Sequence, residues 1–575
     1  MINYLYDKET QTKIFINNFI IEFFPRGKEK NIFTKLWEDE KILDQHSFEL
    51  TKLYKDIISK LKDILNDYHN IEKSEKYWEI CFGYWLWRFI VNYFEKWKSI
   101  EKFLSENKKK LIFYQTNFNN LDFLFFGIDD YIYMDNTEEF NTKVLNEIIR
   151  EINDPNIELK IYDSISFLKK AKLIREKVFR KKNKNLLKKA LFKKNNSNLK
   201  KVFYNTKLSF FDSLIVNLKL GQGFTLFPNN LNLRDIISNE KFEPDLKFRS
   251  IKYNFYKTDL ENFIFNKVIE KIPILFLESY KNQNLLLQTF NLPKNPQLIA
   301  TANGFQGSTI YSQYIANKVE EGSKLYIFQH GGSYGQFKNH FASEFETRLA
   351  DKFFTWGWRH NKEIPFYSLK KINMYKKNKN RNKILLELRA NSSKPKSVEI
   401  SESMYQGYSY YIECLKFFEI IKNTQIEKDL LIKLSPRQFD YDEKKSFLKV
   451  NENLLFADRN IDMIKTREIS KLLIFTTIST GHLEAVATNY PFLILNVYPD
   501  VIKDRYKFIF KKMENLNLLH STGQSLFNTI RALPPDIYKW WQSSQIQDFL
   551  VEYRSLFARY DQKNRINLFC EQLKD

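Results

Sequence analysis

The stretch that most constrains this chain is Lys324–Gly335, KLYIFQHGGSYG. An apolar, β-prone run ends at Gln329 and His330 and is followed at once by Gly331 and Gly332. This pattern predicts a buried strand that runs into a tight glycine turn. Glycine lets the backbone approach a ligand closely, and open α/β sheets bind their ligands at the carboxyl ends of strands. The stretch therefore predicts either a reactive site or a strand end whose histidine is only hydrogen-bonded within the turn.

The neighbouring residues predict where this turn lies in a sheet. Pro296–Phe305 has the composition of a strand, the residues after it have that of a helix, and the glycine stretch supplies the next strand. A strand, a helix and a strand within about 35 residues form a βαβ unit, which implies a parallel sheet. His340–Trp358 then predicts a helix that carries Glu344 and Glu346, followed by a short strand. We therefore expect His330 at the carboxyl end of a strand in an open sheet.

A second alternating pattern begins after Lys370–Asn382, a charged, low-complexity stretch that predicts a linker. Beyond it, apolar runs typical of strands alternate with longer patterns typical of helices. The expected strands are 383–390, 429–437, 470–480 and 491–497, and the expected helices are 404–421 and 481–489. This second set predicts another, smaller βα domain.

The expected fold class is thus α/β, a pair of Rossmann-like domains whose parallel sheets face a cleft, with a helical region before them. The expected parts are a helical N-terminal region 1–108, a first, acceptor-side domain 109–369 with a basic insertion 169–201, a linker 370–382, a second, nucleotide-binding domain 383–533, and C-terminal helices 534–575 that pack back across the interface.

The N-terminal region shows helical periodicity. Apolar residues recur at three- and four-residue spacing through Ser47–Asn66. Tyr77–Trp97 is aromatic on every face of a helix, which predicts burial, and Arg88 in its middle then needs a partner. The segment is expected to be either a core helix or a platform on which an acceptor sugar or lipid stacks.

Composition places the chain among globular proteins of several domains. It has 575 residues, of which 43% are hydrophobic and 16% aromatic. Its three cysteines, Cys81, Cys414 and Cys570, are far apart and form no CxxC pair, so neither a disulfide framework nor a metal site is expected. We find no signal-peptide pattern and no run long enough to span a membrane, so a cytoplasmic protein is expected.

The formal net charge of +22 is unevenly spread. Lys169–Lys201 contains fifteen Lys or Arg and one Glu, a net charge of +14. Such a run is typical of a solvated helix face or an insertion. Apolar residues interleave with it at roughly helical spacing, so it also fits peripheral binding to an anionic inner-membrane surface. Nucleic acid is a third partner for such a charge, although we do not expect it here.

The second predicted domain offers a matching half-site, TTISTGHLEA. Its strand ends near Ser479, Thr480 and Gly481 and leads directly into a helix. Free backbone N–H groups at a helix start, together with hydroxyls, can bind the phosphates of a nucleotide. Glu484, one turn later, is placed to accept hydrogen bonds from ribose hydroxyls. The alternative is an ordinary Ser/Thr N-cap with a glutamate near the capping-box position.

A third group follows the strand in DLLIKLSPR. Lys433, Ser435 and Arg437 gather at its end and could contact a phosphate from a second side, where charge-assisted hydrogen bonds would stabilise the leaving nucleotide. The chain has neither a GxGxxG fingerprint nor a Walker P-loop, which argues against dinucleotide redox chemistry and ATP hydrolysis.

Taken together, these motifs resemble a known group. QHGGSYG, EFETRLADKFFTWGW and WEICFGYWLWRFI look like the bacterial family of transferases encoded in leptospiral and other surface-polysaccharide gene clusters. The resemblance runs from about Trp78 to Tyr498. It implies a transferase and supplies little mechanism.

The pairing of HGG with KLSPR and TISTGHLEA is more distantly similar to CDP-glycerol glycerophosphotransferases and to capsule-type Kdo transferases that use CMP-sugars. That similarity implies a GT-B architecture. It makes His330 the candidate for the first-domain histidine and Ser479 and Thr480 the candidates for phosphate-binding hydroxyls. Pro436 matches the proline of a His-Pro motif, but Ser435 stands before it where the family has histidine, which leaves the identity of the nucleotide open.

The resulting hypothesis is a cytoplasmic GT-B glycosyltransferase of lipopolysaccharide or capsule synthesis. The expected donor is a nucleotide-activated sugar, with a CMP-linked nonulosonate or Kdo-like sugar as first choice, and the expected acceptor is a glycan or glycolipid. His330 is expected to deprotonate the acceptor hydroxyl or to donate to the leaving phosphate, with Glu344 and Glu346 as alternative bases. The residues expected to line the substrate cleft are Gln329, Gly331, Gly332 and Tyr334. Those expected to bind the nucleotide or its phosphates are Lys433, Ser435, Arg437, Ser479, Thr480, Gly481 and Glu484. The expected catalytic residues are His330, Glu344 and Glu346.

No bound metal or cofactor is expected, because GT-B enzymes as a class need none and no DxD-type cluster lies near the predicted cleft. Two rival hypotheses stay open. One is transfer of glycerol phosphate or ribitol phosphate from a CDP-activated donor. The other is a basic, non-catalytic protein that binds a polymer or a membrane and retains a transferase fold.

Overall fold

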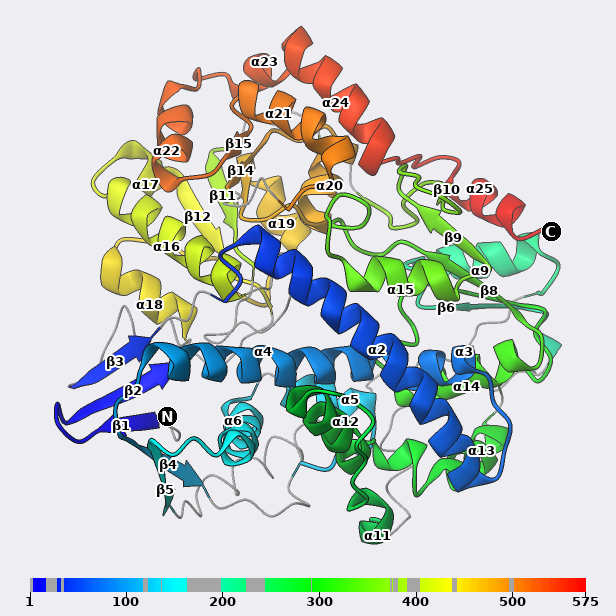
Figure 1. The fold of residues 1–575 in the computed structure, drawn as a ribbon. Helices are drawn as coiled ribbons and strands as arrows, with labels where there is room; N and C mark the ends of the chain where they lie inside the picture. The colour runs from blue at the N-terminus through cyan, green and yellow to red at the C-terminus, as the bar shows by residue number, and fades with distance from the viewer. Residues whose placement is uncertain are drawn as a thin grey trace. The chain divides into compact units, whose positions relative to one another are not determined.

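The computed structural model of the chain describes residues 4–16, 28–32, 36–116, 123–135, 137–162, 198–223, 243–290, 292–372, 375, 381–389, 404–436, 442–495 and 501–574 (Figure 1). The protein is of the α/β class with parallel strands and a helical N-terminal region, as predicted. It forms two compact units. The first comprises Met1–Thr206, Gly221–Leu325 and Lys396–Val398, and the second comprises Lys207–Leu220, Tyr326–Pro395 and Glu399–Asp575.

The first unit begins with strands that the helical periodicity of the later residues did not predict. They belong to a five-stranded sheet of order β3-β2-β1-β4-β5, in which β1 pairs antiparallel with β2 and β4 while β2–β3 and β4–β5 are parallel. The five strands are β1 (Tyr4–Asp7), β2 (Thr12–Ile16), β3 (Glu29–Ile32), β4 (Leu111–Thr116) and β5 (Ile157–Tyr162).

The predicted helices follow these strands. In Figure 1 the long helix α2 crosses α4, and the two are in contact. Helix α2 starts at an N-cap, Asp39, whose carboxylate accepts a hydrogen bond from the N–H of Lys41, and it ends at Asn70 in the left-handed conformation. The segments here are α2 (Glu40–His69), α3 (Glu75–Trp78), a π-helical turn (Glu79–Gly83) and α4 (Tyr84–Glu106).

The aromatic segment Tyr77–Trp97 forms part of the core of this unit. The side chains of Trp78 and Trp85 are fully buried. Arg88 has the partner that its position requires, because its guanidinium donates to Oδ2 of the buried Asp135 from Nη2 at 2.6 Å and from Nε at 3.0 Å. The structure therefore favours the core helix over a stacking platform for sugars.

The remaining elements of the first unit are α5 (Ile128–Met134), α6 (Glu138–Ile152), β6 (Lys201–Tyr204), α11 (Leu246–Arg249), α12 (Asp259–Lys271), the 3₁₀ turn Ile274–Phe276, α13 (Tyr280–Thr289), β7 (Leu298–Thr301) and α14 (Thr309–Glu320). Strands β6 and β7 pair in parallel. Strand β7 and helix α14 match the strand and helix predicted before the glycine stretch.

The glycine turn, Gln329–Gly335, belongs to the second unit and continues the end of β8 (Lys324–Phe328). Strands β8, β9 (Lys352–Thr355) and β10 (Ile364–Pro365) are parallel neighbours in that order, and α15 (Phe341–Leu349) connects the first two. The strand and helix predicted within His340–Trp358 are thus confirmed.

The second sheet of this unit is wholly parallel, with the order β12-β11-β13-β14-β15. Glu387 at the end of β11 is in register with Lys433 of β12 and with Phe475 of β13. The carboxyl ends of these three strands therefore meet at one edge of the sheet, where α/β folds bind ligands. The strands are β11 (Lys383–Glu387), β12 (Leu430–Lys433), β13 (Ser470–Phe475), β14 (Phe492–Leu495) and β15 (Leu519–His520).

Helices pack around this sheet, and those at the C-terminus also contact the β8–β10 region of the same unit. Helix α24 packs on α20, and the N–H of Arg559 donates to the carbonyl of Trp356 at 2.9 Å. The helices are α9 (Phe210–Lys219), α16 (Met404–Ile420), α17 (Gln425–Asp429), α18 (Glu443–Val450), α19 (Met463–Glu468), α20 (Thr480–Ala487), α21 (Lys507–Asn515), α22 (Gly523–Ala532), α23 (Ile537–Trp541), α24 (Ser544–Phe557) and α25 (Arg565–Gln572), with a 3₁₀ turn at Asp504–Tyr506.

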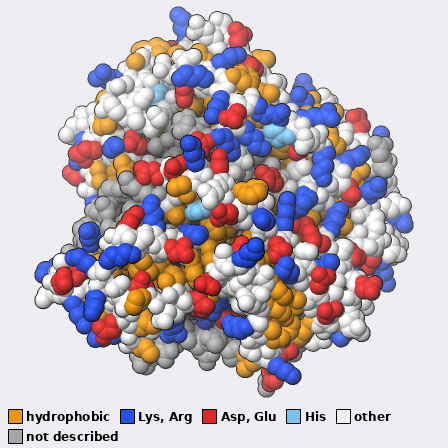
Figure 2. All heavy atoms as spheres, in the orientation of Figure 1, with side chains coloured by type: hydrophobic (Ala, Val, Ile, Leu, Met, Phe, Trp, Pro, Cys, Tyr) orange, Lys and Arg blue, Asp and Glu red, His pale blue; other side chains and the backbone are white. Residues whose placement is uncertain are grey.

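Most of the basic segment Lys169–Lys201 lies outside the described residues. On the face drawn in Figure 2, the basic side chains of the described part are interspersed with acidic ones. Within the described ranges, none of the helices has the length and apolar character needed to cross a bilayer.

Candidate functional site

The turn after β8 is held by Gln329. Its side-chain oxygen accepts hydrogen bonds from the backbone N–H of Trp356 and from Nε1 of Trp358, both at 2.8 Å, and its Nε2 donates to the carbonyl of Gly331 at 2.7 Å. Gln329 was predicted to contact substrate. In the structure, both the oxygen and the nitrogen of its buried amide are hydrogen-bonded within the protein, so Gln329 fixes the turn against the end of β9.

The turn touches the start of helix α20. The N–H of Gly332 donates to Oγ1 of Thr480 at 3.1 Å. A β-carbon at Gly332 would lie 2.3 Å from the carbonyl carbon of Ser479, so only glycine fits there. The two motifs that sequence analysis assigned to opposite domains therefore lie side by side in one compact unit.

Gln336 fixes the same turn through a second set of hydrogen bonds. The side-chain amide of Gln336 donates to the carbonyl of Gly332, and its oxygen accepts from the hydroxyl of Tyr553 at 2.7 Å. Gln336 and Tyr553 are both fully buried. Helix α24, which carries Tyr553, thereby helps to set the position of Gly332 relative to α20.

His330 projects from this turn next to a buried tyrosine and a buried carboxylate. The hydroxyl of Tyr334 donates to Oε1 of Glu346 at 2.8 Å and lies 3.1 Å from Nδ1 of His330. The Glu346 side chain is fully buried, whereas that of His330 is 19% exposed. The structure therefore brings His330, Tyr334 and Glu346 together, with only the histidine open to solvent.

These contacts determine which ring nitrogen of His330 carries the proton. Because the hydroxyl proton of Tyr334 is directed to Glu346, the tyrosine oxygen is left to accept a hydrogen bond from Nδ1–H of His330. Nε2 then carries the lone pair. Burial lowers the pKa of His330 to about 3, and the nearby Lys207 and His340 contribute to the decrease, so the ring is neutral at physiological pH. Nε2 lies farther from the Tyr334 oxygen, at 3.4 Å, and as the unprotonated nitrogen of a neutral imidazole it can accept a proton.

The two glutamates proposed as alternative bases differ in their surroundings. Glu344 is exposed on α15, whereas Glu346, two residues later, is buried beneath Tyr334. Glu346 is thus placed to act through Tyr334 and His330, and Glu344 does not belong to this group of side chains.

Helix α20 starts at the carboxyl-end edge of the second sheet. Ser479 is its N-cap residue, with extended backbone and no side-chain cap hydrogen bond. The first backbone N–H groups of the helix and the Ser479 hydroxyl thus lie beside the glycine turn, in the arrangement that binds phosphate groups at other helix starts. A β-carbon at Gly481 would lie 2.9 Å from Nη2 of Arg467 and 3.1 Å from Oε2 of Glu387, so this glycine makes room for an ion pair beneath the helix.

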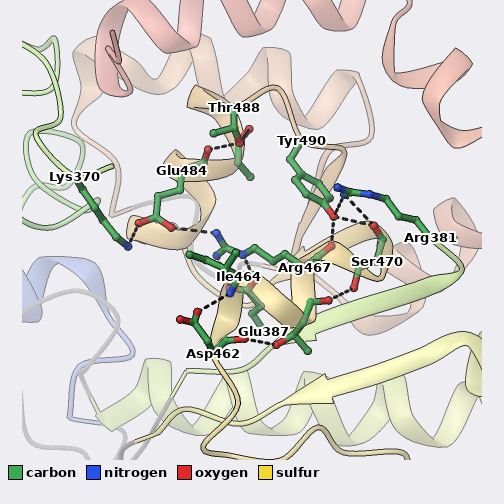
Figure 3. A network of polar contacts seen from close by, with 12 residues as sticks. Lys370, Arg381, Glu387, Asp462, Ile464, Arg467, Ser470, Glu484, Thr488 and Tyr490 are labelled. Carbon is green, nitrogen blue, oxygen red and sulfur yellow. Dashed lines mark hydrogen bonds and ion pairs between the residues drawn. The ribbon is translucent and has the colours of Figure 1, made fainter. Parts of the chain in front are cut away.

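That ion pair belongs to a network under α20 (Figure 3). Arg467 donates to both oxygens of Glu387, at 2.7 and 2.9 Å, and to Oε2 of Glu484 at 3.0 Å. Lys370 donates to the other oxygen of Glu484. Burial alone would lower the pKa of Arg467, but hydrogen bonds and charges from the two glutamates outweigh burial and raise it.

This network changes the interpretation of Glu484. It was predicted to accept hydrogen bonds from ribose hydroxyls, but both of its carboxylate oxygens are engaged by cations. The arrangement gives no support to ribose binding, and it makes Glu484 part of the base on which α20 rests.

The three residues predicted after β12 have different outcomes. The ammonium of Lys433 donates to three backbone carbonyls, those of Asp458, Arg459 and Ile461, at 2.6, 3.2 and 2.7 Å. All three of its N–H donors are therefore used within the protein, and the predicted contact with phosphate finds no support. Ser435 is half-buried beyond the end of β12, and Arg437 lies outside the described residues.

Sequence reasoning missed Arg467, Glu387 and Lys370. Glu387 had a usable signal, because it is a charged residue at the carboxyl end of an apolar strand. Arg467 and Lys370 had none, since they reach the site from a short helix and from a loop far away in sequence. Within the described ranges, no group of His, Cys, Asp or Glu side chains is arranged to hold a metal ion.

Buried histidines make stability depend on pH. Burial lowers the pKa of His482 to about 3 and that of His340 to about 4, whereas an unfolded imidazole titrates near 6.5. Between about pH 4 and 6 the unfolded chain thus binds protons that the folded chain does not, so stability rises with pH. We expect the free energy of unfolding, measured by urea titration, to fall as the pH is lowered from 7 to 5.

A variant isolates one of these groups. His482 lies against the rings of Phe475, Phe492 and Tyr553, and neither of its nitrogens has a hydrogen-bond partner among the described residues. His482→Phe should keep this packing and reduce the slope of stability against pH by about 1.4 kcal/mol per pH unit. An unchanged slope would show that His482 takes up no proton on unfolding.

Comparison with known proteins gives the family. The model of a family described as LIC12162 family transferase matches residues 4–572. The chain belongs to this family of transferases. The match confirms the resemblance to a transferase family that the motifs predicted. None of the curated proteins compared with the chain matches it.

Several solved structures are similar to it. MurG of Acinetobacter baumannii is 12% identical, with a TM-score of 0.32, and the similarity covers 66% of this chain and 99% of MurG. The wall teichoic acid polymerase TagF is 12% identical, with a TM-score of 0.27, and the similarity covers 51% of this chain and 86% of TagF.

Proposed function

We propose that this transferase is a glycosyltransferase of surface-polysaccharide synthesis that takes its sugar from a nucleotide-activated donor. The observation that carries the proposal is the hydrogen bond from Gly332 to Thr480. This contact places the turn that carries the neutral His330 against the amide-rich start of α20. A donor bound at the helix start can therefore meet an acceptor whose proton the histidine takes.

The division of roles follows from the chemistry of each group. The start of α20 is suited to the diphosphate or phosphate of the donor, where negative charge develops as the sugar leaves. His330 is suited to take the proton of the acceptor hydroxyl through Nε2. Glu346, acting through Tyr334, would stabilise the imidazolium that forms. No step in this scheme requires a metal ion or an organic cofactor.

We retain a CMP-linked nonulosonate or Kdo-like sugar as the first candidate donor. Its support is the family resemblance together with the Ser479 and Thr480 hydroxyls at a phosphate-suited helix start. The alternative is glycerol phosphate or ribitol phosphate from a CDP-activated donor, which would use the same helix start. A non-catalytic polymer- or membrane-binding role is the third candidate.

Thermal unfolding with added CMP, CDP or UDP tests these candidates. A ligand present at one hundred times its Kd stabilises the folded state by about 2.7 kcal/mol, so binding should raise the melting temperature visibly. Transfer from radiolabelled CMP- and CDP-linked donors then identifies the reaction. CDP as the only stabilising nucleotide would favour polyol-phosphate transfer, and the absence of any effect would favour the non-catalytic role.

Association with an anionic membrane surface is a second part of the proposal. Helix α9 turns an apolar stripe outward: the exposed fractions of Phe211, Ile215 and Leu218 are 73%, 43% and 43%. Its polar residue Asp212 faces inward and pairs with Arg565 at 2.7 Å. The segment just before it in sequence, Lys169–Lys201, carries a net charge of +14, which complements anionic lipid.

We expect the protein to float with vesicles that contain phosphatidylglycerol and to float much less with phosphatidylcholine alone. The double variant Phe211→Ser, Ile215→Ser should lose most of this binding, because inserted aromatic and aliphatic groups each contribute about 2 kcal/mol. Val551→Ser removes an apolar residue of α24 that is 65% exposed, and it serves as the control. Equal flotation of the double variant and the wild type would contradict the role of α9.

A further inference from the structure

A cluster of cations lies at the far end of the glycine turn and has no role in the scheme above. Segment Val501–Lys503 pairs with the turn: Phe337 and Ile502 form an antiparallel bridge, and the N–H of Lys503 donates to the carbonyl of Gln336 at 2.9 Å. The side chains of Lys503 and Arg505 are therefore positioned by the same turn that carries His330.

Both cations converge on one imidazole. The ammonium of Lys503 lies 3.1 Å from Nε2 of His360, and Nη1 of Arg505 contacts Nδ1 of the same ring. Burial, followed by the charges of Lys503 and Arg505, lowers the pKa of His360 to about 4, so the ring is neutral. A neutral imidazole offers one lone pair, whereas lysine and arginine can only donate. Nη1 of Arg505 also donates to the carbonyl of Arg359 at 3.2 Å. The ring itself can accept from only one of the two cations, so the other faces a protonated ring nitrogen.

No carboxylate of the described residues pairs with either cation of this cluster. Among the described residues, Lys503 and Arg505 form no ion pair, although Lys503 is half-buried. The nearby acids are engaged elsewhere or exposed: Glu363 accepts the N–H groups of His360 and Asn361, at 3.1 and 2.7 Å, and Asp504 pairs with Lys507 at 2.9 Å. Glu344 is exposed on α15, and its charge opposes the lowering of the Lys503 pKa by burial.

A partly buried cation without an ion-pair partner is costly, and a bound anion lowers that cost. An oxyanion would also supply the missing acceptors, since a phosphate group offers several oxygens to one ammonium and one guanidinium. Gly332 touches the start of α20, and Gln336, whose carbonyl accepts from the N–H of Lys503, is four residues later. These two backbone positions therefore lie no more than about 14 Å apart. One pair of substrates could reach both.

We propose that Lys503, Arg505 and His360 bind a phosphate group carried by the second substrate, the acceptor. The assignment of this phosphate to the acceptor rests on the proposed function, in which the donor phosphate lies at α20. The existence of an oxyanion site at these side chains does not depend on the proposed function. A phosphate on a lipid-linked acceptor and a phosphate on a soluble sugar present the same charged group to these side chains.

Calorimetric titration of the full-length protein tests the site. The probes are inorganic phosphate and octyl phosphate below its critical micelle concentration, both at 0.15 M salt so that unspecific attraction is screened, with a Debye length of about 8 Å. We expect Lys503→Gln and Arg505→Gln each to weaken binding at least tenfold. Lys507→Gln removes a charge two residues from Arg505, outside the cluster, and should change affinity less than twofold. Tighter binding of octyl phosphate than of inorganic phosphate would indicate a lipid-linked source.

Lys503→Arg restores the charge and should recover most of the affinity, which separates a binding role from a folding role. In transfer assays, Lys503→Gln should raise the KM for a phosphate-bearing acceptor about tenfold and leave the KM for the donor unchanged. Equal losses in Lys503→Gln and Lys507→Gln, or wild-type affinity in Lys503→Gln, would overturn the site. If phosphate binding depends on Lys503 while no nucleotide stabilises the protein, the oxyanion site stands and the proposed donor chemistry fails.

Discussion

His330→Ala is expected to lower kcat about a thousandfold with little change in melting temperature. A positioned general base contributes about 10² to 10⁴ in rate, and Nε2 of His330 is the ring nitrogen that the contact of Nδ1 leaves unprotonated. The fold should tolerate the change because the side chain is partly exposed and carries no charge at neutral pH. Steady-state kinetics at saturating donor and acceptor, together with thermal unfolding of the same sample, check both parts.

The residues behind the histidine should give graded effects. Tyr334→Phe removes the oxygen that orients His330 and should cost roughly ten- to a hundredfold in kcat, within the range for positioning groups. Glu346→Gln keeps an acceptor for the tyrosine hydroxyl but removes the charge that stabilises an imidazolium. The matched control is Glu344→Gln, an exposed glutamate of the same helix, which should be nearly silent in kcat.

The pH profile separates the two roles that the sequence left open for His330. If the neutral ring acts as a base, its pKa near 3 keeps it in the active form at all working pH values, so this group should cause no loss of kcat/KM between pH 5 and 8. If the ring must donate a proton to the leaving phosphate, activity should rise steadily toward acid pH. Full activity of His330→Ala would remove the residue from the mechanism altogether.

The order of strands and helices could be predicted from the sequence because each leaves a local pattern. The apolar run before Gln329 and the run before Ser479 both end where polar and small residues begin, and both are strands that end near those positions. The three strands before residue 33 were missed because they are only four or five residues long and were grouped with the strong helical periodicity that follows.

The partners of the site residues could not be predicted in this way. Lys433 looked like a phosphate ligand because a lysine follows an apolar strand, yet its ammonium binds carbonyls 25 to 28 residues away in sequence. Glu484 looked like a ribose ligand, yet it pairs with Arg467 and Lys370. Side-chain partners depend on which distant segments the fold brings together, and local pattern carries no information about that.

Gly332 is the position at which the two halves of the candidate site depend on each other. Its N–H bonds to Thr480, and a β-carbon there would meet backbone atoms: the carbonyl carbon and oxygen of Ser479 at 2.3 and 2.4 Å and the nitrogen of Thr480 at 2.4 Å. Backbone atoms cannot rotate out of the way as a flexible side chain can. Gly332→Ala must therefore move the turn away from α20.

We expect Gly332→Ala to lower kcat/KM at least a hundredfold, because a displacement of about 1 Å between reacting groups typically costs that much. The lost hydrogen bond and the strain should also reduce the free energy of unfolding by about 1–3 kcal/mol. Gly307→Ala is the matched control, since the nearest atom to its new β-carbon lies 3.8 Å away. Kinetics and urea unfolding of the two variants measure the difference.

The kinetic and binding data distinguish damage to the fold from damage to the site. If Gly332→Ala remains folded but loses stabilisation by nucleotide, the contact between the turn and α20 is what shapes the donor site. If nucleotide binding survives while kcat collapses, the displacement acts on His330 instead, because the turn carries that histidine two residues before the glycine. Activity within threefold of the wild type would show that the turn and the helix start work independently, and the proposed mechanism would lose the contact on which it rests.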